Sequence, residues 1–251
     1  MESTPFLTID NDSITLSDAI KYLKKTGGLP RMIADILRQY LLEKELNTRT
    51  DIAVDSLQVE QAVLDFRLQN QLTDANRYRT WLTANGISHE EFKNQVAFGI
   101  AVEKFKNELT QSQLEETFKN RKPLLDRVVL SRIVLNEKDL AEDIAKQIQA
   151  NPSQFEPLAR KYSLTEDKAV NGIMGPIRLG TLPPILKAEL EKNRPKNLIG
   201  PLEIDGKYCL FRYEEFLPAT LESVKRELQN QLFEQWMQEK LAKMAIKLEV
   251  K

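Results

Sequence analysis

Residues 128–135 read Val-Val-Leu-Ser-Arg-Ile-Val-Leu, an apolar run rich in β-branched side chains. Such a run is typical of a central strand, because branched side chains pack well on a pleated surface. Further along, residues 199–204 and 207–215 have the same character, and an Asp205-Gly206 step lies between them. A dipeptide of this kind between two apolar runs predicts a tight β-hairpin. The middle of the chain therefore predicts a small sheet.

Helical segments surround these strands within the same region. Apolar residues at three- and four-residue spacing predict helices over residues 137–150, from a cap at Ser153 onward, and over 183–192. A loop that contains glycine and proline is expected over residues 165–182.

The chain before residue 124 has a helical pattern instead. Residues 6–16 suggest a short hairpin, and Ser17 suggests the N-cap of a short helix that ends at Gly27-Gly28. Further helices are expected from Leu29, over 56–71 behind an Asp55 cap, over 75–85, from the capping box at Ser88, and from a second capping box at Ser112 to Lys122, where Pro123 ends the last one.

Two of these helices have apolar rows that bear on packing. In the helix over 56–71, the expected inward residues are Leu57, Val63, Leu64 and Leu68. The helix after Ser88 has one row with Phe92, Val96 and Ile100, and another with Phe98, Val102, Phe105 and Leu109. Two rows indicate burial on more than one side, or one side left free for a partner.

Residues 220–245 read as one long helix with an apolar stripe. A single helix of this length is not stable alone and has to pack against another surface. The N-terminal helices provide that surface, which would make the middle region an insertion. We therefore predict an α+β protein with a helical domain from residues 1–123 plus 219–251, and a second domain over 124–218.

The composition limits the possible classes of partner. The chain has 36 lysines and arginines against 37 aspartates and glutamates, a formal net charge of −1. A nucleic-acid-binding protein needs a basic surface, so no nucleic-acid partner is expected. No run approaches the ~20 apolar residues of a membrane helix, so no membrane insertion is expected. Cys209 is the single cysteine, which leaves no intramolecular disulfide.

Residues 127–216 resemble a parvulin domain. The similarity is carried by residues 129–135, by the helix Gln154-Phe155-Glu156-Pro157-Leu158-Ala159-Arg160-Lys161-Tyr162-Ser163, by the loop Asn171-Gly172-Ile173-Met174-Gly175, and by Ile199-Gly200-Pro201-Leu202 with Asp205-Gly206-Lys207-Tyr208. The order of helices, parvulin unit and last helix is similar to that of the SurA and PrsA chaperone group. This resemblance implies a four-stranded antiparallel sheet with about four helices in the middle unit.

The chain departs from the parvulin pattern where active members resemble one another most. They have two histidines on adjacent central strands and an Asp or Cys in the glycine loop. Here Arg132 and Tyr208 stand at the histidine positions and Ile173 at the Asp/Cys position. Arg132 and Tyr208 are expected to be neighbours, either as a remodelled peptide-binding floor or as a stacked pair that only fills the former site.

The apolar part of the family's proline pocket remains. Its positions hold Leu182 and Leu186, with Met174 nearby. The single histidine, His89, is expected in solvent at the first turn of an N-terminal helix. No metal site and no cofactor are expected.

The resemblance implies a chaperone that binds unfolded or extended polypeptides, with outer-membrane or secreted proteins as clients. The altered positions predict peptidyl-prolyl cis-trans isomerase activity that is weak or absent. Two alternatives stay open: a genuine slow prolyl isomerase, and an assembly factor dedicated to one secretion system. Residues 1–5 have no signal-peptide character, so the location is periplasmic by resemblance or cytoplasmic if Met1 is the native start. The oligomeric state is not indicated.

Overall fold

A computed structural model describes residues 5–249 and divides the chain into two compact units. One unit, here called the helical unit, comprises the residues up to Ser112 and those from Gln229 onward. The other, the sheet unit, is Gln113–Leu228. Both boundaries fall inside long helices, α5 (His89–Leu125) and α9 (Leu221–Ala242). The predicted α+β class is confirmed.

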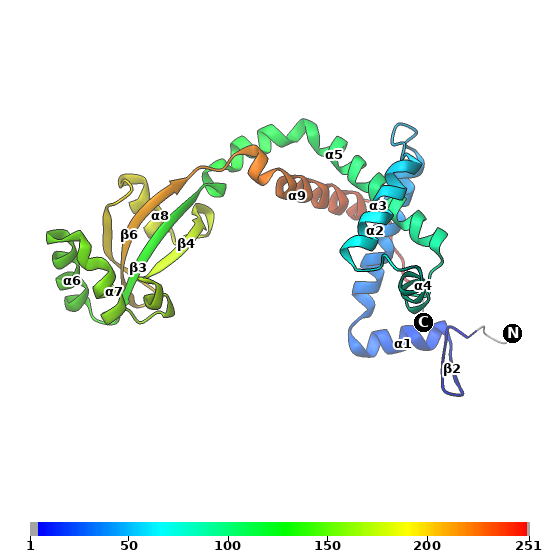
Figure 1. The fold of residues 1–251 in the computed structure, drawn as a ribbon, viewed down its shortest axis with the longest axis horizontal. Coiled ribbons are helices and arrows are strands. Elements are labelled where there is room, and N and C mark those ends of the chain that lie inside the picture. The colour runs from blue at the N-terminus through cyan, green and yellow to red at the C-terminus, as the bar shows by residue number, and fades with distance from the viewer. Residues whose placement is uncertain (1–4, 250–251) are drawn as a thin grey trace. The chain divides into compact units, whose positions relative to one another are not determined.

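The sheet unit contains four antiparallel strands in the order β4-β3-β6-β5 (Figure 1). Their bounds are Arg127–Leu135 for β3, Ile173–Arg178 for β4, Leu198–Ile204 for β5 and Lys207–Leu217 for β6. The loop expected over 165–182 is therefore wrong in its centre, where β4 pairs with β3. The sequence did not indicate this strand because it contains Gly175 and Pro176, which are uncommon inside strands. Both residues are tolerated because β4 is an edge strand.

Helices cover both faces of this sheet. On one face, α6 (Lys138–Ala150) and α7 (Phe155–Tyr162) pack against Ile133, Leu135 and Leu210. On the other face, α8 (Pro184–Lys192) contributes Leu186 and Leu190 to a second core. Short 3-10 turns lie at Pro152–Gln154, Glu166–Val170 and Leu179–Thr181. The cap expected at Ser153 is displaced, because the Asn151 side chain caps this turn.

The helical unit begins with a hairpin of β1 (Leu7–Ile9) and β2 (Asp12–Ile14). Then come α1 (Leu16–Thr26), α2 (Leu29–Asn47), α3 (Ser56–Gln69), α4 (Ala75–Ala84) and α5. The N-cap of α1 is Thr15 rather than the expected Ser17. The other expected caps hold: Asp55 caps α3, and Ser88 and Glu91 exchange hydrogen bonds at the start of α5. No helix in residues 5–249 is long and apolar enough to cross a membrane.

The α5 helix is continuous, which corrects the prediction of two helices separated before Ser112. The second capping box does not form, because no glycine or proline precedes it to release the backbone. Thr110 lies two residues before Ser112. Its hydroxyl donates to the Lys106 carbonyl at 2.8 Å, as a threonine inside a helix can. Pro123 lies in the last turn and does not end the helix, which runs on to Leu125.

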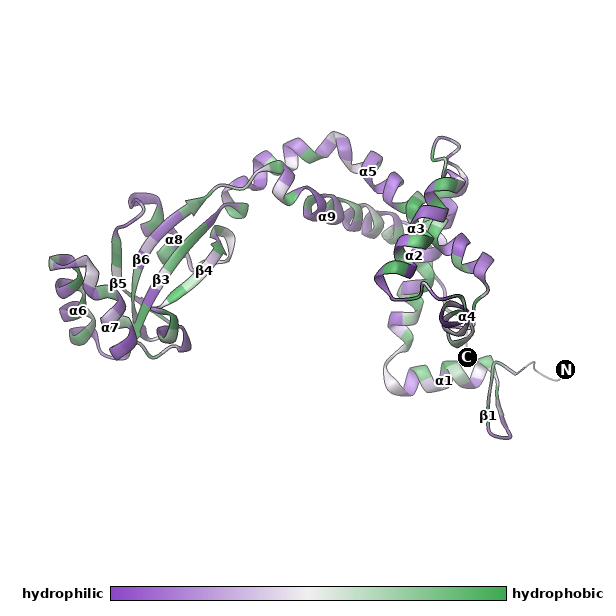
Figure 2. Ribbon diagram, viewed as in Figure 1, coloured by the Kyte–Doolittle hydropathy of each residue, from purple (hydrophilic) through white to green (hydrophobic). Residues whose placement is uncertain are grey.

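The two apolar rows of α5 are buried on two sides, and hydrophobic and hydrophilic residues alternate along the helix (Figure 2). The row with Phe92 packs with α3 and α4. The row with Phe105 packs with α2 and with Phe233 and Met237 of α9. Phe105 lies 6.2 Å from Phe233 between ring centroids. The C-terminal helix thus packs on helices from the first half of the chain.

The inward face expected for α3 is wrong. Val59 and Val63 are buried, whereas Leu57, Leu64 and Leu68 are 74%, 49% and 63% exposed. The two sets lie about 140° apart around the helix axis at 3.6 residues per turn, and the valines face α4 and α5. The periodicity revealed a helix but not which of two apolar stripes it buries. The leucine row is left in solvent.

Replacing Phe233 by Ala should destabilise the protein by about 3–5 kcal/mol, because the change removes a ring from a closed core. Equilibrium denaturation of the full-length chain measures the effect. Leu57→Ala is the matched control and should stay within about 0.5 kcal/mol of the parent, since Leu57 is exposed. Equal losses in the two variants would contradict the packing described for α9 and α3.

Candidate functional site

The candidate site lies on the sheet face that α8 covers. Val128, Leu130 and Val134 of β3 point to this face, together with Cys209, Phe211 and Tyr213 of β6. Side chains alternate between the two faces along a strand, so Arg132, which lies between Leu130 and Val134 at alternate positions, belongs to the same face. It introduces a cation into an otherwise apolar surface, and its side chain is 33% exposed.

Arg132 is held by the loop that precedes β4. Its Nε donates to Asp167 Oδ2 at 2.7 Å, and Asp167 Oδ1 accepts a further hydrogen bond from the Thr165 hydroxyl at 2.5 Å. The backbone N–H of Arg132 donates to the Gly172 carbonyl at 2.8 Å, and Gly172 N–H donates to the Asp167 carbonyl at 2.8 Å. The guanidinium is thus held by a carboxylate through its Nε.

Gly172 is the residue that permits this close approach. Its φ is +80°, and a Cβ added there would lie 2.3 Å from the Arg132 carbonyl oxygen. No side chain fits at that distance, so the loop can press on β3 only with glycine here. Gly175 of the same segment also has a positive φ, +74°, but nothing lies within 4 Å of its added Cβ.

Tyr208 does not lie beside Arg132, and the expected neighbourhood of these two residues is wrong. Tyr208 pairs with Leu135 of β3 and packs on the face covered by α6 and α7. Arg132 pairs with Phe211. The two side chains therefore point to opposite faces, which excludes both a shared peptide-binding floor and a stacked pair.

Phe211 and Cys209 are the β6 side chains that share Arg132's face. Phe211 is its direct partner across the ladder, and Cys209 is diagonal to it. Cys209 is buried, and burial raises the pKa of its thiol, with Arg132 opposing that rise. Neither residue can replace a histidine as a proton-exchanging pair with Arg132.

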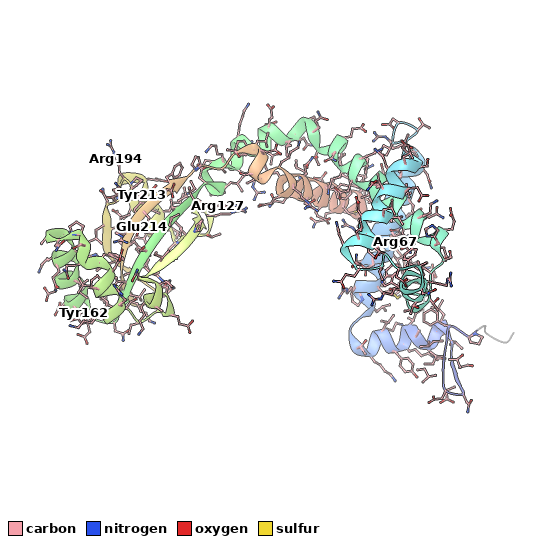
Figure 3. The ribbon with its side chains drawn as sticks, viewed as in Figure 1. Arg67, Arg127, Tyr162, Arg194, Tyr213 and Glu214 are labelled. Atoms are coloured by element: carbon pink, nitrogen blue, oxygen red, sulfur yellow. The ribbon has the colours of Figure 1, made fainter. Side chains whose placement is uncertain are left out.

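The opposite face holds a polar chain of its own. Glu214 follows Tyr213 on β6 (Figure 3) and accepts hydrogen bonds from the Ser131 hydroxyl at 2.5 Å and from Arg212 Nε at 2.6 Å. The Arg212 guanidinium lies 4.6 Å from the Phe155 ring centroid. Ser131 is fully buried and bonded to a carboxylate, so it is placed as a structural residue and not as a nucleophile.

The three apolar residues predicted for a proline pocket all contact one cluster. Met174 and Leu182 are partly exposed on it, whereas Leu186 is 1% exposed and belongs to the core beneath. Ile173 is 46% exposed beside Met174. The structure therefore brings Met174, Leu182 and Leu186 together.

The single histidine is far from this sheet in sequence and lies in the helical unit. His89 is exposed at the start of α5, and its Nδ1 lies 2.9 Å from the Tyr78 hydroxyl. Within residues 5–249 there is no cluster of histidine, cysteine, aspartate and glutamate that could hold a metal ion.

Comparison with known proteins identifies the middle of the chain. Residues 135–215 match the model of the rotamase family, the PPIC-type PPIase domain. The sheet unit is therefore a parvulin-type prolyl isomerase domain. No curated protein matches the chain.

The whole chain has the fold of the PrsA foldases. It aligns with a PrsA peptidylprolyl isomerase of Bacillus cereus at 18% identity and a TM-score of 0.50, covering 99% of this chain and 96% of that one. PrsA of Bacillus anthracis aligns at 20% identity, a TM-score of 0.46, and 87% and 99% coverage. A SurA-like chaperone structure of Campylobacter jejuni aligns at 14% identity, a TM-score of 0.38, and 98% and 100% coverage. The expected resemblance to the SurA and PrsA group is confirmed.

Several residues of the site were not found from the sequence. Asp167 and Gly172 gave no signal as partners of Arg132, because the contact joins a loop to a strand 35 residues away. Phe211 and Cys209 were missed because β3 and β6 are not joined by a turn that fixes their register. Counting alternate residues on both strands from the buried positions is the signal that could have found them.

Gly172→Ala should unfold or strongly destabilise the sheet unit, since a methyl group cannot occupy the space held by the Arg132 carbonyl. Gly175→Ala is the control for backbone conformation alone, and it should cost about 1–2 kcal/mol. Thermal denaturation followed by circular dichroism compares the two. A Gly172 variant as stable as the Gly175 variant would contradict the clamp between loop and strand.

Proposed function

We propose that this chain is a folding chaperone that binds non-native polypeptides through its helical unit, and that its parvulin domain has weak or no prolyl isomerase activity. The observation that carries the second part is the Arg132–Asp167 ion pair at the centre of the α8 face. It stands where the family's first histidine is expected.

Prolyl isomerisation needs neither a nucleophile nor a cofactor. The barrier of about 18–20 kcal/mol arises from the partial double bond of the peptide unit. A catalyst lowers it by binding the twisted amide better than the planar forms. Such binding requires polar groups aimed at the reacting carbonyl, and each is worth about 2.7–4 kcal/mol in comparable enzyme sites.

Here the one cation of the site is paired with a carboxylate. Arg132 is bound to Asp167 through its Nε, the facing β6 residues are Phe211 and Cys209, and Ile173 is exposed at the start of β4. Met174 and Leu182 keep an apolar surface that can receive a proline ring. The site therefore supports recognition of an apolar side chain better than catalysis.

The proposed client surface is the leucine row of α3. Leu57, Leu64 and Leu68 lie at positions seven and four residues apart, so they follow one face of the helix. All three are exposed. A row of leucines in solvent is costly for a soluble protein unless something covers it. An extended chain with apolar side chains covers such a row without demanding a particular sequence.

A hollow rich in hydrogen-bonding groups begins where this row ends. Its volume is about 530 Å³, and its lining includes the carboxamides of Asn70, Gln71 and Asn76, the Thr80 side chain and the Trp81 ring. Carboxamides both donate and accept hydrogen bonds, as peptide groups do. Arg77 adds one cation to this lining. The carboxamides suit a polypeptide main chain, and the neighbouring leucines suit its apolar side chains.

The proposal includes the two-domain organisation, with 1–123 plus 219–251 as the chaperone domain and 124–218 as the parvulin domain. The division into compact units supports one part of this proposal, namely that the N-terminal and C-terminal segments belong to the same domain. The boundaries proposed here place the ends of α5 and α9 with the helical domain.

Isomerase activity should be at least about a hundredfold below that of an active parvulin, as expected when polar transition-state contacts are absent. A protease-coupled assay on Ala-Pro peptides with the full-length protein measures the specificity constant. A value within about tenfold of an active parvulin would favour the alternative of a genuine isomerase and overturn the argument from Arg132.

Chaperone activity should depend on the α3 leucines. The triple variant Leu57→Glu, Leu64→Glu and Leu68→Glu should weaken binding of an unfolded test protein by at least about tenfold, a change of about 1.4 kcal/mol. Suppression of aggregation and fluorescence anisotropy both measure this. Ile173→Glu is the matched control in the parvulin domain, because its 46% exposure is close to the 49% of Leu64. Loss in the control alone would place client binding on the parvulin domain.

A further inference from the structure

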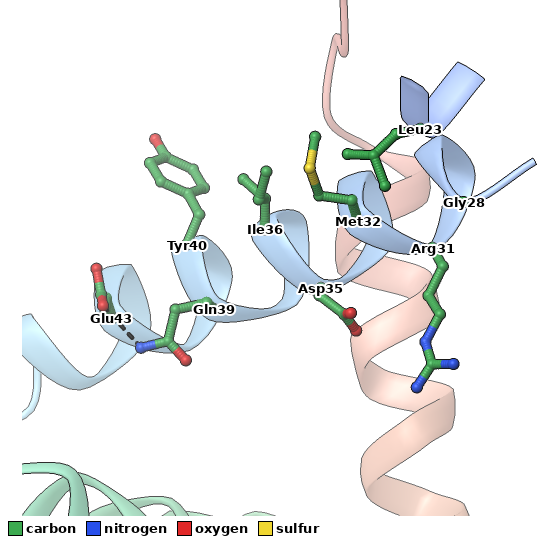
Figure 4. A pocket seen from close by; sticks show the side chains of 9 residues that line it. All are labelled: Leu23, Gly28, Arg31, Met32, Asp35, Ile36, Gln39, Tyr40 and Glu43. Carbon is green, nitrogen blue, oxygen red and sulfur yellow. Dashed lines mark hydrogen bonds between the residues drawn. The ribbon is translucent and has the colours of Figure 1, made fainter. Parts of the chain in front are cut away.

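Two hollows that the function proposed above does not use differ in the groups that line them. One, of about 810 Å³, runs along α2, and Figure 4 shows its apolar side chains in one row, with Arg31 and Asp35 turned to the other side. The other, of about 260 Å³, lies in the sheet unit on the face that α6 and α7 cover. The second hollow brings two cations together over an apolar floor.

The smaller hollow is here called the β5 pocket. Its apolar residues are Ile148 of α6, which is 3% exposed, the half-buried Leu198 of β5, and Pro152. Its charged residues are Lys196 and Arg212, and no carboxylate lines it among the described residues. Leu198 and Arg212 are direct partners across the ladder of β5 and β6. The same sheet therefore holds one of the cations beside the floor.

Lys196 has a backbone conformation that favours glycine, with a φ of +77°. Its N–H donates to the Tyr213 carbonyl at 2.5 Å, and the Tyr213 N–H donates to the Asn197 carbonyl at 3.0 Å. Two residues therefore face one, which is a β-bulge of the type that ordinarily has glycine in the left-handed position. Glycine adopts this conformation without strain, so the backbone gives no reason for a lysine here.

Both cations have hydrogen-bonding capacity that the described chain does not use. The Lys196 ammonium has no ion-pair or hydrogen-bond partner within residues 5–249. Arg212 donates from Nε to Glu214 at 2.6 Å and from Nη2 to Glu156 at 3.4 Å. A guanidinium has five N–H donors, so both N–H groups of Nη1 are left without an acceptor in the same residues. A negatively charged ligand can therefore bind both cations without breaking an existing hydrogen bond.

The charges around the β5 pocket suit a ligand with a single negative charge. Arg212 and Glu214 form a close pair at 2.6 Å and neutralise each other. Glu156 is farther from Arg212, at 3.4 Å, and water screens its side chain, which is 44% exposed. Lys196 is then the one charge of this group without a partner in the described chain. A carboxylate matches that charge, whereas a phosphate, with about −1.5 to −2 charges, exceeds it and would be repelled by both glutamates.

The remaining lining and the volume fit the last residue of a polypeptide. Gln149 and Asn197 contribute carboxamides, and within the described chain the Gln149 side chain forms no hydrogen bond and Asn197 Oδ1 accepts none. Pockets that enclose drug-sized ligands have about 300–1,000 Å³, so 260 Å³ receives one residue-sized group. A C-terminal residue presents a carboxylate, its own N–H and a side chain within that space. An acidic side chain inside a polypeptide brings only methylene groups to the apolar floor.

We propose that the β5 pocket binds the C-terminal residue of a polypeptide whose last side chain is apolar. The α-carboxylate accepts hydrogen bonds from Lys196 and from Nη1 of Arg212, and the N–H of the bound residue donates to a carboxamide oxygen of the lining. The side chain packs on Ile148 and Leu198. Capture of a chain-end carboxylate is a recurrent mode of peptide recognition. The strain at Lys196 is then explained, because strained backbone is retained where function requires a particular side chain.

The β5 pocket is separate from the two sites discussed above. It lies on the sheet face covered by α6 and α7, whereas the Arg132 site lies on the face covered by α8. The leucine row of α3 belongs to the other compact unit. The proposal therefore rests neither on the proposed chaperone activity nor on the state of the isomerase site.

Titration of the isotope-labelled, full-length protein with the dipeptide acetyl-Ala-Leu, followed by NMR, tests the proposal. The peptide should bind with a Kd of about 1 mM, as expected for contact through one residue, and should shift the amide signals of Gln149, Asn197 and Leu198. The same peptide with a C-terminal amide, and acetyl-Glu amide with its acid on the side chain, should each bind at least about tenfold more weakly. Equal Kd values for the three peptides, or tighter binding of inorganic phosphate, would overturn the proposal.

Variants of Lys196 separate binding from structure. Lys196→Gly should weaken binding of acetyl-Ala-Leu at least about tenfold and raise the midpoint of thermal unfolding, because glycine relieves the strain. Lys196→Gln should weaken binding equally with an unchanged midpoint. Gln149→Glu, which puts a carboxylate into the lining from an exposed helix position, should abolish binding. Lys207→Gln is the control, since it removes the same charge from an exposed residue outside the pocket and should leave the Kd unchanged.

A purely structural role for Lys196 gives the opposite pattern. In that case Lys196→Gly would unfold at a lower temperature than the parent and bind the peptide with the parent's Kd. That result would overturn the proposal, as would a loss of binding in Lys207→Gln as large as that in Lys196→Gln, which would show attraction by net charge alone.

Discussion

The packing of the last helix on the first helices is the constraint on which this structure depends. Phe233 and Met237 of α9 complete a core with Leu41, Leu42 and Phe105, residues that come from α2 and α5. The chain has to leave the helical unit and return to it, so whatever lies between α5 and α9 must bring its own ends together. The parvulin domain meets this requirement, because its first strand, β3, and its last, β6, are neighbours. Asp126, just before β3, accepts hydrogen bonds from the Ala219 N–H and from Lys122 at 2.7 Å each.

The same sheet that joins entry and exit also carries the candidate site. Residues of β3 and β6 share one face of this sheet under α8. This chain has an Arg132–Asp167 ion pair and the bulk of Phe211 there. The loop geometry that holds Asp167 in place depends on Gly172. The fold is that of a parvulin domain, and its α8 face holds an ion pair between Arg132 and Asp167.

The sequence was sufficient for the class of fold, because strand composition and helix periodicity are local signals. It also predicted that α9 packs on the N-terminal helices. For α5 it left open burial on two sides or one side free for a partner, and the structure shows the first. It failed where two surfaces of similar hydrophobicity compete, as on α3, where Val63 is buried and Leu64 is exposed. It failed again at Tyr208, because a difference of one residue in strand alternation moves a side chain to the other face. The absence of a histidine pair did not depend on that register, since His89 is the only histidine. Arg132 was found from the motif, but its partner Asp167 depends on tertiary structure.

Hydrogen exchange of the full-length protein with and without a bound unfolded polypeptide tests the central claim most directly. Each amide reports whether its own element becomes protected, so the two units are compared in one sample. If the helical unit binds clients, protection should rise in α3 and the segment that follows it, at residues 56–72. Residues 172–186 of the parvulin domain should be unchanged. Protection confined to residues 172–186, with α3 unchanged, would contradict the account and show that the parvulin domain is the client-binding part.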